Sequence, residues 1–191
     1  MRNIELHYNR LATLRLDFEQ EMLYAGRRKI REVGSLALRR PQKMRWEYSE
    51  PQGKLLVGDG DRLKMYNPLT NQVRTVKVED TGDLRAPLAF LLGRLRFSRQ
   101  FRNLRFEQVE GRQVIVGEGR SGKEYYNRVE FGYEPANHSL TDLRVFGRDD
   151  SLNVFRFSNE RINPTLASGL FVFEPPPGAE VIAESPLRRE R

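Results

Sequence analysis

Apolar and polar residues alternate along most of this chain. Leu14, Leu16, Phe18 and Met22 fall on one side of the first alternating segment, and charged residues lie between them. Successive side chains of a strand point to opposite faces of a sheet, so this pattern predicts a half-buried strand. The same period of two recurs in Leu36 and Leu38; Met44, Trp46 and Tyr48; Leu63 and Met65; Leu104 and Phe106; Val114 and Val116; Val129, Phe131 and Tyr133; Phe155 and Phe157; Phe171 and Phe173.

Residues typical of tight turns separate these segments. They include Asp59-Gly60, Asn67-Pro68, Glu110-Gly111 and Asn163-Pro164. Many short strands joined by tight turns predict a mainly antiparallel sheet whose alternating apolar residues face a core on one side. We expect one domain over residues 1–191.

Two segments have a different pattern. Over residues 3–12, Ile4, Tyr8 and Leu11 recur at helical spacing, which predicts a short amphipathic helix. Residues 86–95 are the most apolar stretch, and Pro87 suits a first helical turn. A helix that is apolar nearly all round must be covered, so this one either plugs the sheet as core or forms a lid whose inner side meets a ligand.

Composition narrows the possible partners and chemistries. The net charge of +7, from 33 Lys and Arg against 26 Asp and Glu, makes nucleic acid or an anionic membrane surface plausible partners. No apolar stretch approaches the roughly 20 residues that cross a bilayer. The chain has no cysteine, and His7 and His138 have no partner at ligand spacing, so we expect no metal and no cofactor.

Two strings of residues loosely match functional motifs. Gly117, Gly119 and Gly122 with Lys123 match part of a phosphate-binding loop, but a strand pattern follows instead of a helix, which favours a hairpin loop. A basic series containing Phe97, Phe101 and Phe106 is compatible with a single-strand nucleic-acid surface, or with core phenylalanines between solvated arginines. The series comprises Arg94, Arg96, Arg99, Arg102 and Arg105. No nucleophile elbow or zinc-protease helix is present, so we expect no catalytic residue and no enzyme.

Four segments together resemble the LolA family of periplasmic lipoprotein carriers in order and spacing. The first places Arg40-Pro41 ahead of a strand with Trp46, and the last contains Phe-x-Phe-x-Pro-Pro from Phe171. The four segments cover residues 34–51, 57–73, 86–92 and 171–178. The resemblance extends from about Leu11 to Val181, which is nearly the whole chain.

The resemblance implies an incomplete antiparallel barrel, that is, a curved sheet with a helical lid over an apolar cavity. It implies a periplasmic, monomeric carrier that binds the acyl chains of lipoproteins and moves them from an inner-membrane releasing transporter to an outer-membrane acceptor. Met1 is followed directly by Arg2, Asn3 and Glu5, with no apolar segment of a secretory signal, which is compatible with a cytosolic protein or with the mature part of a secreted one. The resemblance implies the second, a periplasmic protein given without its signal peptide. The alternatives are a carrier or sensor of another lipid on the same fold, and a basic nucleic-acid-binding protein.

The candidate site follows from the sheet pattern and the resemblance together. The residues expected to line the acyl-chain cavity are Phe18, Leu36, Met44, Trp46, Tyr48 and Met65 on the sheet, and Leu88, Phe90, Leu91 and Leu92 on the lid. The period of two carries Arg40, but not Arg39, to the side of Leu36 and Leu38. The resemblance implies that Arg40 latches the lid helices; the alternative is a solvated basic pair at a strand end.

Overall fold

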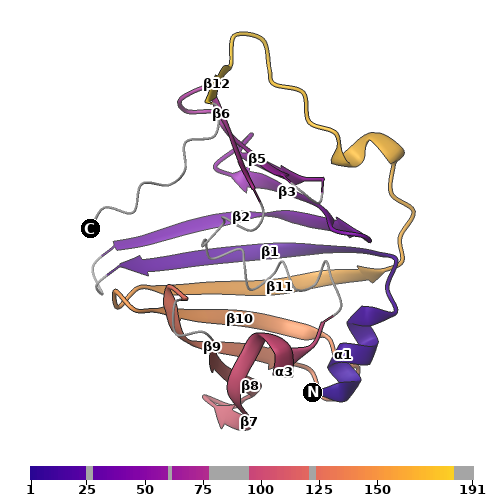
Figure 1. Ribbon diagram of the computed structural model, residues 1–191, viewed down its shortest axis with the longest axis vertical. Helices are drawn as coiled ribbons and strands as arrows, with labels where there is room; N and C mark the ends of the chain where they lie inside the picture. The colour runs from indigo at the N-terminus through magenta and orange to yellow at the C-terminus, as the bar shows by residue number, and fades with distance from the viewer. Residues whose placement is uncertain (25–27, 60–61, 78–94, 121–123, 183–191) are drawn as a thin grey trace.

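The computed structural model describes residues 1–191 except 25–27, 60–61, 78–94, 121–123 and 183–191. In this part of the chain, twelve strands form one sheet in the order β12-β6-β5-β4-β3-β2-β1-β11-β10-β9-β8-β7 (Figure 1). Neighbouring strands are antiparallel except β12 and β6. Their bounds are β1 Thr13–Tyr24, β2 Arg28–Arg39, β3 Lys43–Glu50, β4 Leu55–Gly58, β5 Arg62–Asn67, β6 Gln72–Lys77, β7 Phe101–Val109, β8 Arg112–Gly119, β9 Tyr126–Tyr133, β10 Leu140–Gly147, β11 Leu152–Ile162 and β12 Glu180–Ile182.

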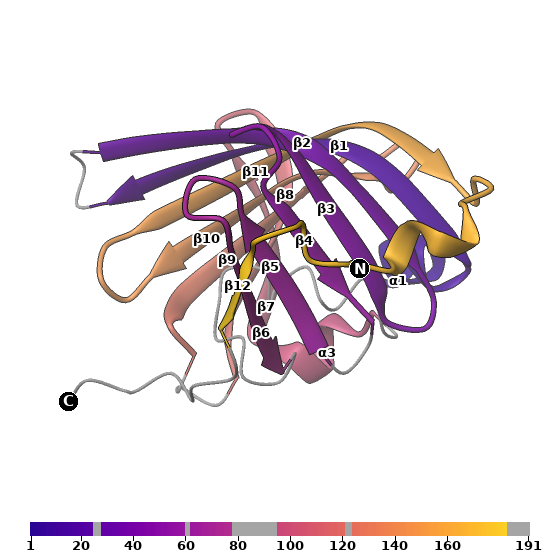
Figure 2. The same ribbon diagram turned by 90° about the horizontal axis from the view of Figure 1, so that it is seen from above.

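The sheet is open and curved. Figure 2 shows it arched, with helices α1 and α3 on its concave side. We call the concave side, which carries Phe18, Trp46 and Phe131, the inner face, and the convex side the outer face. The strands at the two ends of the order are β12 and β7, so the sheet does not close on itself. The predicted mainly antiparallel, incomplete barrel is confirmed.

The first predicted helix is present and slightly shorter than expected. Helix α1 spans Arg2–Asn9, buries Ile4 and Tyr8, and ends where the chain turns into β1. Two further short helices are α3, Phe97–Gln100, and the 3-10 turn η3, Ser168–Phe171. The helix expected over 86–95 lies outside the described residues except for Leu95, which is fully buried. No helix in the described ranges is long and apolar enough to span a membrane.

The inner face carries the hydrophobic core, and β1 shows how the alternation produces it. Leu14, Leu16 and Phe18 are buried against the core, whereas Arg15 points to the other side and is exposed. Burial of apolar side chains contributes roughly 1.5–3 kcal/mol each, which outweighs the weak pairwise terms on the opposite face. The predicted half-buried strand is therefore correct at this position.

The assignment of faces in β8 was wrong. Val114 and Val116 were expected on the inner face, but the residue paired with Phe131 of β9 is Ile115, and Ile115 is the one in the core cluster. Val114 and Val116 instead pair with Gly132 and Glu130. All three β8 residues are buried, so no polar residue between them marked the parity.

The strand expected at Phe171 and Phe173 is also absent. Phe171 ends the 3-10 turn η3, and the next strand, β12, begins at Glu180. Phe171 is buried and Phe173 packs near Tyr66, with ring centroids 6.2 Å apart. Apolar residues at a spacing of two can pack onto a sheet without joining its ladder, and the prolines from Pro175 onward lack the N–H that a ladder needs.

Both motif-like strings have structural roles. Gly117 and Gly119 lie in β8, which pairs antiparallel with β9, so the predicted hairpin is confirmed while residues 121–123 lie outside the described part. Phe97 and Phe101 are fully buried in the core, as the alternative interpretation proposed, and Phe106 on the edge strand β7 is 52% exposed. The arginines of this series that are described, Arg96, Arg99, Arg102 and Arg105, are exposed.

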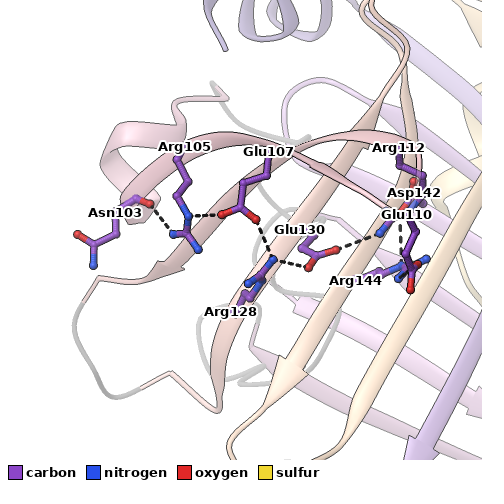
Figure 3. A network of polar contacts seen from close by, with 9 residues as sticks. All are labelled: Asn103, Arg105, Glu107, Glu110, Arg112, Arg128, Glu130, Asp142 and Arg144. Carbon is purple, nitrogen blue, oxygen red and sulfur yellow. Dashed lines mark hydrogen bonds and ion pairs between the residues drawn. The ribbon is translucent and has the colours of Figure 1, made fainter.

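The outer face of β7 to β10 carries a chain of ion pairs (Figure 3). Glu107 contacts both Arg105 and Arg128, and Arg128 lies 2.8 Å from Glu130. Arg112 joins Glu130, at 3.1 Å, to Asp142, at 2.5 Å. A second group on β11, β1, β2 and β3 links Arg156, Glu19, Arg31 and Glu50. The arginines of these two groups are therefore matched by neighbouring carboxylates.

Candidate functional site

The inner face of β1, β3 and β11 is a continuous aromatic surface. The ring of Phe18 meets Trp46 edge-on at 4.8 Å and Tyr48 at 5.1 Å, and Trp46 meets Phe155 at 5.9 Å between centroids. All four side chains are at most 4% exposed. Gly34 makes this packing possible, because a Cβ at that position would lie 2.9 Å from the Phe18 ring.

Most of the predicted cavity residues lie together in the structure. Phe18, Leu36, Met44, Trp46 and Tyr48 belong to one buried cluster, and Met65 is half-buried against it. The remaining four, Leu88, Phe90, Leu91 and Leu92, lie outside the described residues. The sheet side of the candidate site is thus assembled from strands β1, β2, β3 and β5.

Sequence reasoning missed a second part of the same surface. Phe131 lies between Phe97 and Phe101, with ring centroids at 5.1 and 5.3 Å, and Leu143 and Phe155 continue the cluster toward β1. The alternation in β9 and β11 placed Phe131 and Phe155 on one face, but did not show that this face was shared with β1 and β3.

Helix α1 is fixed to the sheet and to the segment before α3 by buried polar contacts. The Leu140 N–H donates to Tyr8 Oη, and Tyr8 Oη donates to Glu160, both at 2.7 Å. Burial, followed by the neighbouring Glu160 carboxylate, raises the pKa of the Tyr8 phenol well above its usual range. Asn9 exchanges two hydrogen bonds with the backbone of Leu95, at 2.9 and 2.6 Å. The helix therefore covers one end of the inner face and joins strands β10 and β11 to residue 95.

Arg40 and Arg39 make contacts on opposite sides of the sheet. Arg40 Nη2 donates to the carbonyl of Tyr8, in the last turn of α1, at 2.9 Å, and burial lowers the pKa of this guanidinium. Carbonyls of a last helical turn lack partners within the helix and attract cations. Arg39 instead donates to the Leu166 carbonyl at 2.5 Å and lies 5.1 Å from the Phe171 ring. The parity expected from the sequence agrees with these contacts.

The surface built by these residues suits binding rather than bond making. The side chains that form the cluster are almost entirely apolar, and such a surface attracts ligands through removal of apolar area from water. The described side chains lining it are at most 5% exposed, apart from Met65, so the surface is closed in this structure.

A family model described as outer membrane lipoprotein carrier protein LolA matches residues 9–174. This chain belongs to the LolA family. An outer-membrane lipoprotein carrier protein of Dechloromonas aromatica is 30% identical over 173 residues, which are 90% of this chain and 82% of that LolA relative. The resemblance found in the sequence is therefore confirmed.

Solved structures show the same fold at low sequence identity. A putative outer membrane lipoprotein-sorting protein domain from Vibrio parahaemolyticus aligns with a TM-score of 0.54 and 10% identity, covering 90% of this chain and 94% of that one. An uncharacterized conserved protein from Thermus thermophilus aligns with a TM-score of 0.61 and 12% identity, covering 96% and 98%. These likenesses establish that the open curved sheet of this LolA-family chain is a recurrent fold.

Proposed function

We propose that this chain carries acylated lipoproteins through the periplasm, from a releasing transporter in the inner membrane to an acceptor at the outer membrane. The observation that carries the proposal is the closed aromatic inner face around Trp46 in a chain of the LolA family. A lipoprotein in water exposes its acyl chains at a cost of about 0.8 kcal/mol per methylene. A carrier lowers this cost by enclosing the chains, and it performs no reaction.

The acyl-chain cavity would form when the segments that cover the inner face move away from it. Phe18, Trp46 and Met65 offer large apolar side chains, and methionine repacks readily around flexible groups. The residues expected from the sequence to play the same role on the lid, Leu88, Phe90, Leu91 and Leu92, would lie on its ligand side. Among the described elements, α1 is the cover at one end.

Arg40 would act as the latch of the closed form. Its hydrogen bond to the Tyr8 carbonyl ties the turn after β2 to the last turn of α1. A bound acyl chain has to compete with this closed arrangement, so the latch weakens cargo binding and favours release. Weak binding is required of a carrier, because the final acceptor must bind the cargo more tightly.

Cargo binding can be measured with the chain's own fluorescence. Trp46 is its single tryptophan and lies on the inner face. Titration with a synthetic diacylated lipopeptide should shift Trp46 emission and saturate. Met65→Glu, at a half-buried inner position, should weaken binding at least tenfold because a charge next to acyl chains is poorly solvated. Lys64→Glu, the neighbouring residue on the opposite face, is the matched control and should bind normally.

The latch is tested by onward transfer. Arg40→Leu should fold and accept the lipopeptide, but deliver it to acceptor vesicles several-fold more slowly, because the closed form no longer competes with cargo. Arg39→Leu should transfer at the normal rate. Equal transfer by the two variants would remove Arg40 from the mechanism. Native mass spectrometry of the protein isolated from its host separates lipoprotein cargo from the alternative, a free lipid.

A further inference from the structure

Polar side chains cross the inner face beyond the aromatic surface, at the end opposite α1. Asn153 on β11, Gln20 on β1 and Glu32 on β2 are 1%, 5% and 6% exposed. Gln20 and Glu32 are cross-strand partners, and Asn153 pairs with Met22, two residues after Gln20 on the same face. We call Asn153, Gln20 and Glu32 the polar row.

The contacts within the polar row leave two of its buried polar atoms without a hydrogen-bond partner in the described part of the chain. Gln20 Nε2 donates to Asn153 Oδ1 at 3.1 Å, and Lys54 Nζ lies 2.5 Å from Glu32 Oε1 and 4.4 Å from the centre of the Tyr48 ring. Asn153 Nδ2 and Glu32 Oε2 are buried and have no hydrogen-bond partner within the described ranges. Buried polar atoms without partners are destabilising, and native proteins keep few of them.

The two atoms differ in what they can accept from a ligand. Asn153 Nδ2 can only donate a hydrogen bond, and Glu32 Oε2, as part of an ion-paired carboxylate, can only accept one. They belong to the strands on either side of β1. Neighbouring strands lie about 4.8 Å apart, and Asn153 is offset from Glu32 by two residues along the strands, so these two side chains start roughly 12 Å apart at the backbone. A ligand that satisfies both must therefore carry separate acceptor and donor groups.

We propose that the polar row binds the polar linkage of an acylated ligand. Asn153 donates to an ester or amide carbonyl, Glu32 accepts from a hydroxyl or an amide N–H, and the acyl chains extend from there over Phe18 and Phe155. Phe155 is the cross-strand partner of Gln20, and Phe18 precedes Gln20 on the same face of β1, so the polar and apolar surfaces are contiguous. This assignment rests on the proposed function and adds a ligand class to it.

The row should select acylglycerol-type ligands over free fatty acids and plain hydrocarbons. A fatty-acid carboxylate supplies acceptors only and adds a second negative charge near Glu32, which is unfavourable in a buried site. A hydrocarbon supplies neither group. A diacylglycerol and the diacylglyceryl group of a lipoprotein share the required ester carbonyls, so both should bind.

The test compares four ligands by Trp46 emission: a diacylated lipopeptide, dilauroylglycerol, laurate and dodecane. The wild-type protein should bind the lipopeptide and dilauroylglycerol more tightly than laurate. Asn153→Leu should weaken both about five- to tenfold, as expected for one lost hydrogen bond, and leave dodecane unchanged. Asn127→Leu, at an exposed position of β9, is the matched control.

Glu32→Gln tests the charge separately. It keeps the shape of the side chain and removes the repulsion, so laurate should bind at least fivefold more tightly than it does to the wild-type protein. Glu50→Gln, an exposed glutamate of β3 that pairs with Arg31, should leave laurate binding unchanged.

The outcomes separate this assignment from the proposed carrier function. Equal affinities of the wild-type protein for all four ligands, or variants that keep the wild-type ratios, would make the polar row purely structural while acyl binding stands. Binding of the lipopeptide alone would place the selectivity on its peptide and overturn the assignment. Binding of no acyl ligand would overturn both proposals. Asn153→Ala replaces the leucine variant if circular dichroism shows that the latter does not fold.

Discussion

The two faces of the sheet are stabilised by different interactions, although their residues alternate along the same strands. On β9, Val129 and Phe131 enter the buried core, while Arg128 and Glu130 join the ion-pair chain of the outer face. Apolar contacts are non-directional, so the inner face is held together by buried area rather than by fixed pairing geometry. Ion pairs with fixed geometry hold neighbouring strands in register. The outer face therefore fixes the register of the strands, and the inner face buries apolar area without a fixed pairing geometry.

The outer face is more deeply packed than its charge suggests. Glu130 is 2% exposed and Asp142 6%, because the long side chains of Arg112, Arg128 and Arg144 lie over them. Arginine stems cover apolar and polar surface while the guanidinium groups bind carboxylates. At β9 and β10 the outer face is therefore buried as well as charged.

The largest expected difference between the faces comes from truncation of Phe131. Its ring is fully buried between Phe97 and Phe101, so Phe131→Ala should lower the free energy of unfolding by about 3–5 kcal/mol. Arg156→Ala on the outer face should change it by less than about 1 kcal/mol. Urea unfolding followed by circular dichroism measures both, and similar losses would contradict the division between the faces.

Glu130→Ala should be the most damaging change on the outer face. It removes a buried carboxylate from Arg112 and Arg128 and should lower the free energy of unfolding by about 1–3 kcal/mol. Glu110→Ala removes an exposed partner of Arg144 and should cost less than about 1 kcal/mol. If both variants unfold at the same urea concentration, the burial of Glu130 adds nothing to the free energy of unfolding beyond an exposed ion pair.

Alkaline pH should act on the inner face. Burial raises the pKa of Tyr126 from 10.0 to about 12, with a smaller contribution from Glu124. A group whose pKa is raised on folding contributes stability that is complete below its unfolded pKa and is lost as pH rises toward the folded pKa. Stability should therefore fall between about pH 10 and 12, and Tyr126→Phe should make that fall less steep, while Tyr8, whose pKa is also raised, accounts for the remainder. Thermal unfolding across this range measures it, and an unchanged slope would contradict the assignment.

The smallest expected effect concerns Glu19 on the outer face. The hydrogen bond from Arg31, assisted by the charges of Arg31 and Arg156, lowers the pKa of this carboxyl. A lowered pKa contributes stability above the unfolded pKa that is lost as pH falls through the folded value. Arg31→Met should raise the pKa of Glu19 toward its ordinary value, which an NMR titration of the side chain would detect, with little change in the unfolding midpoint at neutral pH.

The sequence by itself determined the elements in which apolar residues alternate with charged residues. Leu14, Leu16 and Phe18 separated by charged residues identified β1 and its inner face, and parity separated Arg40 from Arg39 before their contacts were known. The order of short segments also identified the family. These features are local, so each could be inferred from residues a few positions apart.

Tertiary structure alone decided what depended on pairing between distant segments. Ile115, rather than Val114 or Val116, faces the core because its partner is Phe131, and a run of apolar residues contains no signal for that choice. The spacing of Phe171 and Phe173 matched a strand, but no ladder forms there. The polar row joins Gln20 to Asn153 across 133 residues of sequence. Alternation assigns a side chain to a face, whereas strand pairing determines which side chains share that face and what each of them meets.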